Sequence, residues 1–104
     1  MDEIKLYENK EIRSVWDEEK EKCFFSIIDI VSILTESSNP RRYWSDLKKK
    51  IKDEEGGIQV YEKIVQLKMK STDGKMRKTD VADMQGVFRI IQSIPSPKAE
   101  PFKI

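Results

Sequence analysis

The sequence predicts a single α+β domain in which a small antiparallel sheet packs with about three helices, two of them a helix-turn-helix-like pair. The N-terminal stretch alternates apolar and polar residues with a period of two, which is typical of a β-meander. Residues 27–36 and 40–55 instead place apolar residues at helical spacing. Another alternating stretch surrounds an Asp-Gly pair and predicts a later β-hairpin. The length of 104 residues fits one domain, 1–104.

The N-terminal meander is expected to contain three short strands. Apolar side chains alternate over residues 4–8 and again over residues 12–16, with the polar stretch "ENKE" between them. A charged turn at 17–21 then leads into "KCFF", the expected third strand. Short alternating runs separated by polar turns favour antiparallel pairing of neighbours.

The first helix is expected to begin after Ser26. The Ser26 hydroxyl can accept a free backbone N–H, and Asp29 follows three residues later, as in a capping box with Asp in place of Glu. The segment "IIDIVSILTE" that follows is apolar around most of its circumference. We therefore expect this helix to be largely buried.

A second helix is expected to start at Pro40, where a missing N–H costs nothing, with Asn39 as its cap. Gly56-Gly57 should end it, and residues 58–63 carry no clear pattern. Its apolar face consists of Tyr43, Trp44, Leu47 and Ile51. We expect the two aromatic residues to belong to the core rather than to stack on nucleic-acid bases.

The C-terminal part should form a hairpin and a third helix. Residues 64–78 alternate around Asp73-Gly74, a tight-turn signal because glycine accepts positive φ. Thr79 or Asp80 is expected to cap a helix over residues 81–94, which the sequence "PSP" would stop.

The residue content argues against an enzyme and against a cofactor or metal ion. The chain has no histidine, the usual general base and metal ligand, and its single cysteine lacks a histidine to activate it. No glycine loop of the phosphate-binding kind is present. Asp80 and Asp83 are better explained by a helix N-terminus than by an acid–base or Mg²⁺ site. No signal peptide or membrane-spanning run is visible, which favours a cytoplasmic location.

Charge is balanced overall but unevenly distributed. The chain has 20 basic and 19 acidic residues, a net charge of +1, yet residues 39–52 contain six bases and one acid. Residues 63–78 also contain six bases and one acid, whereas residues 1–22 contain eight acids and five bases. Local asymmetry of this kind can attract a polyanion. The candidate DNA-binding residues are Arg41, Arg42, Lys48, Lys49 and Lys52 in the second helix, and Lys68, Lys70, Lys75, Arg77 and Lys78 in the hairpin.

Two interpretations of these basic segments remain open at the level of composition. Arginines at the start of the second helix can contact base edges or phosphates, with lysines following the DNA backbone. Alternatively, the lysines are only the solvated side of amphipathic elements, and the domain recognises a protein. Nucleic-acid binding and protein recognition are almost equally favoured on these grounds.

A family resemblance favours DNA. The segments "FFSIIDIVSILTESSNPRRYWSDL" and "TDVADMQGVFRIIQSIPSPKAEPFK" resemble the two signatures of the BRO family N-terminal (Bro-N) domain of phage and prophage antirepressor-type proteins. The matching residues are Phe25, Ile27, Asp29, Ile30, Leu34, Asn39, Pro40 and Arg41, and then Phe88, Arg89, Ile90, Ile91, Pro97, Ala99, Phe102 and Lys103.

The resemblance implies an α+β fold and a DNA-binding role in transcription regulation, usually as the first domain of a longer protein. The family pattern continues past "FK" to a tryptophan, so we expect this chain to be an excised N-terminal domain. The expected partner is double-stranded DNA. The alternative is a protein-recognition module that binds a repressor or its own C-terminal region, and exposed edge strands could also produce a homodimer.

Overall fold

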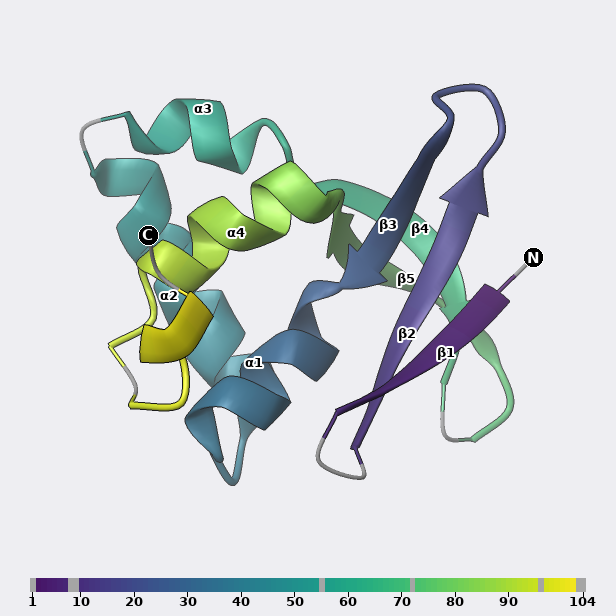
Figure 1. Ribbon diagram of the computed structural model, residues 1–104, viewed down its shortest axis with the longest axis horizontal. Helices are drawn as coiled ribbons and strands as arrows, with labels where there is room; N and C mark the ends of the chain where they lie inside the picture. The colour runs from purple at the N-terminus through teal and green to yellow at the C-terminus, as the bar shows by residue number, and fades with distance from the viewer. Residues whose placement is uncertain (1, 8–9, 55, 72, 96, 103–104) are drawn as a thin grey trace.

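The computed structural model describes residues 2–7, 10–54, 56–71, 73–95 and 97–102, and it has a sheet on one side and helices on the other (Figure 1). The five-stranded antiparallel sheet has the order β1-β2-β3-β5-β4. Its strands are β1 (Asp2–Tyr7), β2 (Lys10–Asp17), β3 (Lys22–Ser26), β4 (Val65–Lys70) and β5 (Met76–Ala82). The helices are α1 (Ile27–Thr35), α2 (Pro40–Asp53), α3 (Gly57–Tyr61), α4 (Met84–Gln92) and a 3₁₀ turn, η1 (Glu100–Phe102). The predicted α+β class is therefore confirmed.

Both faces of the sheet carry apolar side chains. On one face, Phe25 and Ile12 pack against the helical core. Side chains alternate along β3, so Phe24 lies on the other face of the sheet. There it forms a second small core with Met69 and Val81. Phe24 is 4% exposed and Met69 is 1% exposed, although the helices lie on the opposite face. Partly buried Val15, Val65 and Leu67 pack against these residues, so side chains of the sheet itself shield the second core from water.

The helical core surrounds α1, as its nearly continuous apolar sequence predicts. Five of its nine residues are buried, and α2 contributes the buried side chains of Trp44, Leu47 and Ile51. Helix α4 adds Val87, Ile90 and Ile91. Full burial of one such aliphatic side chain stabilises a fold by about 1.5–3 kcal/mol, so this layer supplies most of the driving force for folding.

The predicted caps of the first two helices are confirmed. The Ser26 hydroxyl accepts a hydrogen bond from the Asp29 N–H at 3.3 Å, and the Asn39 side chain accepts one from the Arg42 N–H at 3.2 Å. Pro40 occupies the first turn of α2. Helix α1 ends at Glu36, whose φ of 53° is the left-handed conformation common at helix C-termini.

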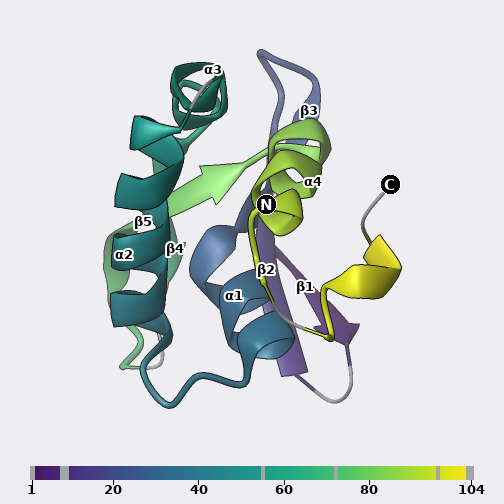
Figure 2. The same cartoon turned by 90° about the vertical axis from the view of Figure 1, so that its left-hand side faces the viewer.

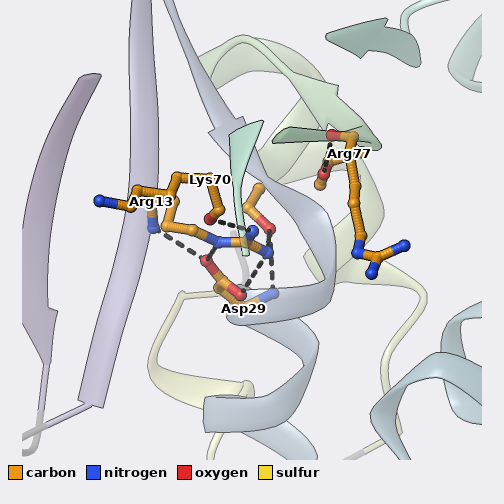
Figure 3. Close-up of polar contacts among 6 residues, drawn as sticks. Arg13, Asp29, Lys70 and Arg77 are labelled. Carbon is orange, nitrogen blue, oxygen red and sulfur yellow. Dashed lines mark hydrogen bonds and ion pairs between the residues drawn. The ribbon is translucent and has the colours of Figure 1, made fainter. Parts of the chain in front are cut away.

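The Asp29 carboxylate binds Arg13 of β2. The Arg13 guanidinium donates to both Asp29 oxygens, from Nε at 2.8 Å and from Nη2 at 3.1 Å, and also to the Ser26 hydroxyl at 3.2 Å (Figure 3). Its Nη1 reaches the Lys70 carbonyl of β4 at 3.1 Å. Strand β3 ends at Ser26, where α1 begins. The Arg13 side chain reaches past this end of β3 and links β2 to β4.

In the second half of the chain, the structure adds one short helix and corrects one predicted cap. Residues 58–63, which carry no clear sequence pattern, overlap α3 (Gly57–Tyr61), so the described residues contain four α-helices where about three are expected. Neither Thr79 nor Asp80 caps the last helix, because β5 continues to Ala82, which pairs with Phe25 of β3. Asp83 is the cap, and its carboxylate accepts from the Gly86 N–H at 2.9 Å. Within the described ranges, no helix is long and apolar enough to cross a membrane.

Candidate nucleic-acid interface

Helix α2 carries its basic residues in two rows. Arg41, Lys48 and Lys52 repeat after about two and about three turns of a 3.6-residue helix, so they line one side. Arg42 and Lys49 form a second row, about a quarter-turn further round and away from the core. All of these side chains are exposed except Lys48, which is half-buried.

The β4–β5 hairpin divides its basic residues between its two faces. Lys68 pairs with Lys78, and the neighbouring pair on the same face is Gln66 with Asp80. Lys70, paired with Met76, follows on this face nearer to the turn. Arg77 pairs with Met69 and therefore belongs to the opposite face, and Lys75 lies in the turn between the strands.

Asp80 is the point at which α2 meets the hairpin. Its Oδ2 accepts from the Trp44 indole N–H at 2.8 Å and from the Lys48 ammonium at 2.9 Å, while Oδ1 accepts from the Gln66 amide at 3.1 Å. Burial raises the pKa of Asp80, but the hydrogen bonds from Lys48, Trp44 and Gln66 outweigh it and lower the pKa below its ordinary value. Asp80 is thus held as a carboxylate between three elements.

This junction places basic residues of α2 and of the hairpin on one side of the molecule. Figure 2 shows α2, β4 and β5 together on the left, with α4 and η1 on the right. Lys78, which pairs with Lys68, lies two residues from Asp80 on the same face of β5, roughly 7 Å along the strand. We call Arg41, Lys48, Lys52, Lys68 and Lys78 the shared basic surface.

The charges of this region are only partly compensated. Asp80 pairs with Lys48, and on the other face Arg77 pairs with Asp73. Hydrogen bonds from Ser71, Arg77 and the Lys75 N–H lower the pKa of Asp73 to about 2. In the part of the chain that the structure describes, no ion pair joins an acid to any other candidate DNA-binding residue: Arg41, Arg42, Lys49, Lys52, Lys68, Lys70, Lys75 or Lys78.

The aromatic residues of α2 belong to the core, as predicted. Trp44 is 3% exposed, and Tyr43 is half-buried against the helical core. Their position leaves no aromatic platform on α2 for an unpaired base, so stacking of the kind used for single strands has no support there. Lys52 instead lies over the ring of Tyr61 in α3, with its Nζ 5.3 Å from the ring centre.

Asp80 and Gln66 are the residues of the junction between α2 and the hairpin that the sequence does not reveal. An aspartate just before an apolar helical run is a standard capping signal, and the pairing of Asp80 with Gln66 of β4 shows that Asp80 is still in a strand. Asp83, which does cap α4, is bound by the Lys22 ammonium at 3.1 Å. Among the described residues, no group of three or more His, Cys, Asp or Glu side chains is placed to hold a metal ion.

Comparison with known proteins identifies the family. Searches of curated proteins and of solved structures gave no significant match. The profile of "BRO family, N-terminal domain" matches residues 11–104, nearly the whole chain. The match includes α1, α2, the β4–β5 hairpin and α4, the elements around the shared basic surface. The chain therefore belongs to the BRO family, of which it represents the N-terminal domain.

Proposed function

We propose that this chain is the DNA-binding domain of a phage or prophage antirepressor-like regulatory protein, that it catalyses no reaction, and that it acts in the cytoplasm as the first domain of a longer protein. One observation carries the proposal. Basic residues from two segments far apart in the sequence, α2 and the hairpin, lie on the same side of the molecule with Asp80 between them. A polyanion is the partner that such a surface attracts.

Arg41 and Arg42 are the residues proposed to contact DNA at the start of α2. Both are exposed, and they stand at the helix end where the backbone dipole favours an anion. A guanidinium there can bind a phosphate or the edge of a guanine. Lys49 and Lys52 follow along the helix and would contact phosphates, which strengthens binding without reading sequence.

The hairpin is proposed to supply the second group of phosphate contacts. Lys68 and Lys78 are cross-strand neighbours, so one backbone segment can meet both ammonium groups. Lys70 and Lys75 extend the positive charge toward the turn. Arg77 has a lesser role in this proposal because it faces away and is paired with Asp73.

The test measures the affinity of the domain for a labelled random-sequence DNA duplex. Binding is monitored by fluorescence anisotropy at two salt concentrations. Arg41→Glu/Arg42→Glu should weaken binding roughly tenfold or more and lower the salt slope by about two. The control, Lys20→Glu/Arg89→Glu, changes the net charge by the same amount at exposed residues outside the shared basic surface. Equal affinity of the Arg41/Arg42 variant and the parent would refute the assignment of these two residues.

A second candidate function is recognition of a protein, either a repressor or a C-terminal region of the same protein. It is favoured by exposed apolar side chains, since Ile58 is 62% exposed, Met84 51% and Trp16 47%. Retention of a purified repressor at high salt without any DNA binding would support this function over the first. The open edges of β1 and β4 could also pair two copies, which sizing chromatography would detect.

A further inference from the structure

Asp80 connects α2 with the β4–β5 hairpin, and these two elements otherwise pack on different parts of the fold. Helix α2 packs on α1 and on α3, while the hairpin is held by the pairing of β5 with β3 and by the second core. The hydrogen bonds from Trp44, Lys48 and Gln66 to Asp80 join α2 to both hairpin strands. A single carboxylate therefore bridges α2 and the hairpin.

The burial of this junction makes it suited to such a role. The Asp80 side chain is 11% exposed and the Lys48 side chain 32%, so the ion pair is partly shielded from solvent. Trp44 anchors the same carboxylate from the core, because its ring is packed and only its N–H reaches Asp80. Charged hydrogen bonds in shielded positions hold geometry better than exposed ion pairs do.

We propose that Asp80 is a positioning residue that holds the hairpin against α2, so that Lys68 and Lys78 engage the same DNA segment as Arg41 and Lys52. This inference rests on the proposed DNA-binding function and adds to it a residue that does not itself contact DNA. Without Asp80, the hairpin lysines would remain exposed and charged, but they would no longer be held in register with the helix.

Charge alone predicts a different outcome from positioning. Removal of a carboxylate beside the basic surface should tighten binding to a polyanion and release Lys48 for a phosphate. That effect leaves the contribution of Lys68 and Lys78 unchanged. Positioning instead predicts that their contribution falls, whatever happens to the absolute affinity.

The first experiment measures the effect of Lys68→Ala/Lys78→Ala on the salt slope, in the parent and in Asp80→Ala. The lysine pair should lower the slope by about two in the parent, one unit for each phosphate that is no longer bound. In Asp80→Ala it should lower the slope by less than about one. An equal effect in the two backgrounds would overturn the proposal.

Asp83→Ala is the matched control. It also removes a half-buried aspartate that binds a lysine, Lys22, and it adds the loss of a helix cap. Asp83 lies outside the α2–hairpin junction, so the lysine pair should keep its full effect in this background. If Asp83→Ala abolished that effect as well, general destabilisation would explain the Asp80 result and the proposal would fail.

The second experiment does not depend on DNA. The chain has two tryptophans, so Trp16→Phe leaves Trp44 as the only indole, and Trp16 is exposed enough to be replaced. In that background, Asp80→Ala should raise acrylamide quenching of Trp44 severalfold while the far-ultraviolet circular dichroism stays unchanged. Unchanged quenching would refute the positioning role. If the parent domain fails to bind DNA but quenching rises, the proposed function is wrong and the structural role of Asp80 stands.

Discussion

Replacement of Arg13 by alanine removes the side chain that ties β2 to α1 and β4. The guanidinium donates hydrogen bonds to both Asp29 oxygens, to the Ser26 hydroxyl and to the Lys70 carbonyl. After the substitution, the Asp29 carboxylate keeps one hydrogen bond from residue 13, because the backbone N–H there donates to Oδ2 at 2.9 Å. The Asp29 side chain is only 15% exposed, so water cannot fully replace the missing guanidinium.

The expected destabilisation is about 2–3 kcal/mol. A hydrogen bond to a charged group contributes roughly 1.5–3 kcal/mol, and bonds that share one carboxylate do not add fully. Removal of one partner from a fully buried ion pair typically costs about 3–5 kcal/mol of stability. The Arg13 side chain is 24% exposed, so water partly hydrates this site and the cost should be smaller. Urea unfolding followed by circular dichroism gives the free energy of unfolding directly.

A double-mutant cycle separates the Arg13–Asp29 interaction from other effects. Arg13→Ala, Asp29→Asn and the double variant should give a coupling energy of about 1–2 kcal/mol. Arg77→Ala is the control, since its pair with Asp73 is exposed and should cost less than about 0.5 kcal/mol. A loss in Arg13→Ala no larger than that of the control, or a coupling energy near zero, would refute the reasoning.

Three further predictions concern stability and can be measured by the same unfolding assay. Asp80→Asn should be less stable than the parent near pH 7, and this difference in the free energy of unfolding should shrink below about pH 4. The pKa of Asp80 is lowered in the folded state, so its carboxylate stabilises the fold at pH values above the ordinary carboxyl pKa. That stabilisation is lost as the pH falls through the folded-state pKa. A difference that stays constant down to pH 2 would contradict this. Gly57→Ala should cost about 2 kcal/mol or more, because a Cβ there would stand 1.5 Å from the Ile51 carbonyl oxygen and force α2 and α3 apart; an unchanged midpoint would contradict it. Asn39→Ala should cost about 1 kcal/mol through loss of the α2 cap, whereas Asn39→Ser should restore most of that loss.

Local signals predicted the helices that begin at strong caps and the strands that alternate regularly. Ser26 and Asn39 satisfy backbone donors within three residues, so the sequence alone contains the information. Helix α3 could not be predicted this way, because five residues are too few for a helical period to appear. It is held instead by close packing of Gly57 against the end of α2.

The candidate site depends more on tertiary structure. The basic segments are visible in the sequence, but their common side of the molecule follows from the packing of α2 beside β4 and β5, which Asp80 bridges. The sequence alone predicts too early an end for β5, because the extension to Ala82 depends on pairing with β3, a segment more than fifty residues away. The division of Lys78 and Arg77 between opposite faces likewise follows from strand register, which the turn and the second core determine.

The salt dependence of duplex DNA binding by the unmodified domain tests the central claim most directly. The shared basic surface offers four cations besides the paired Lys48, and the exposed Arg42 and Lys49 stand beside them on α2. Six phosphate contacts at about 0.9 each predict a slope of about −5.4 in a plot of log K against log salt concentration. We expect clear binding at low salt that declines with this slope. A slope flatter than about −1, or no binding to duplex DNA at low salt, would contradict the account.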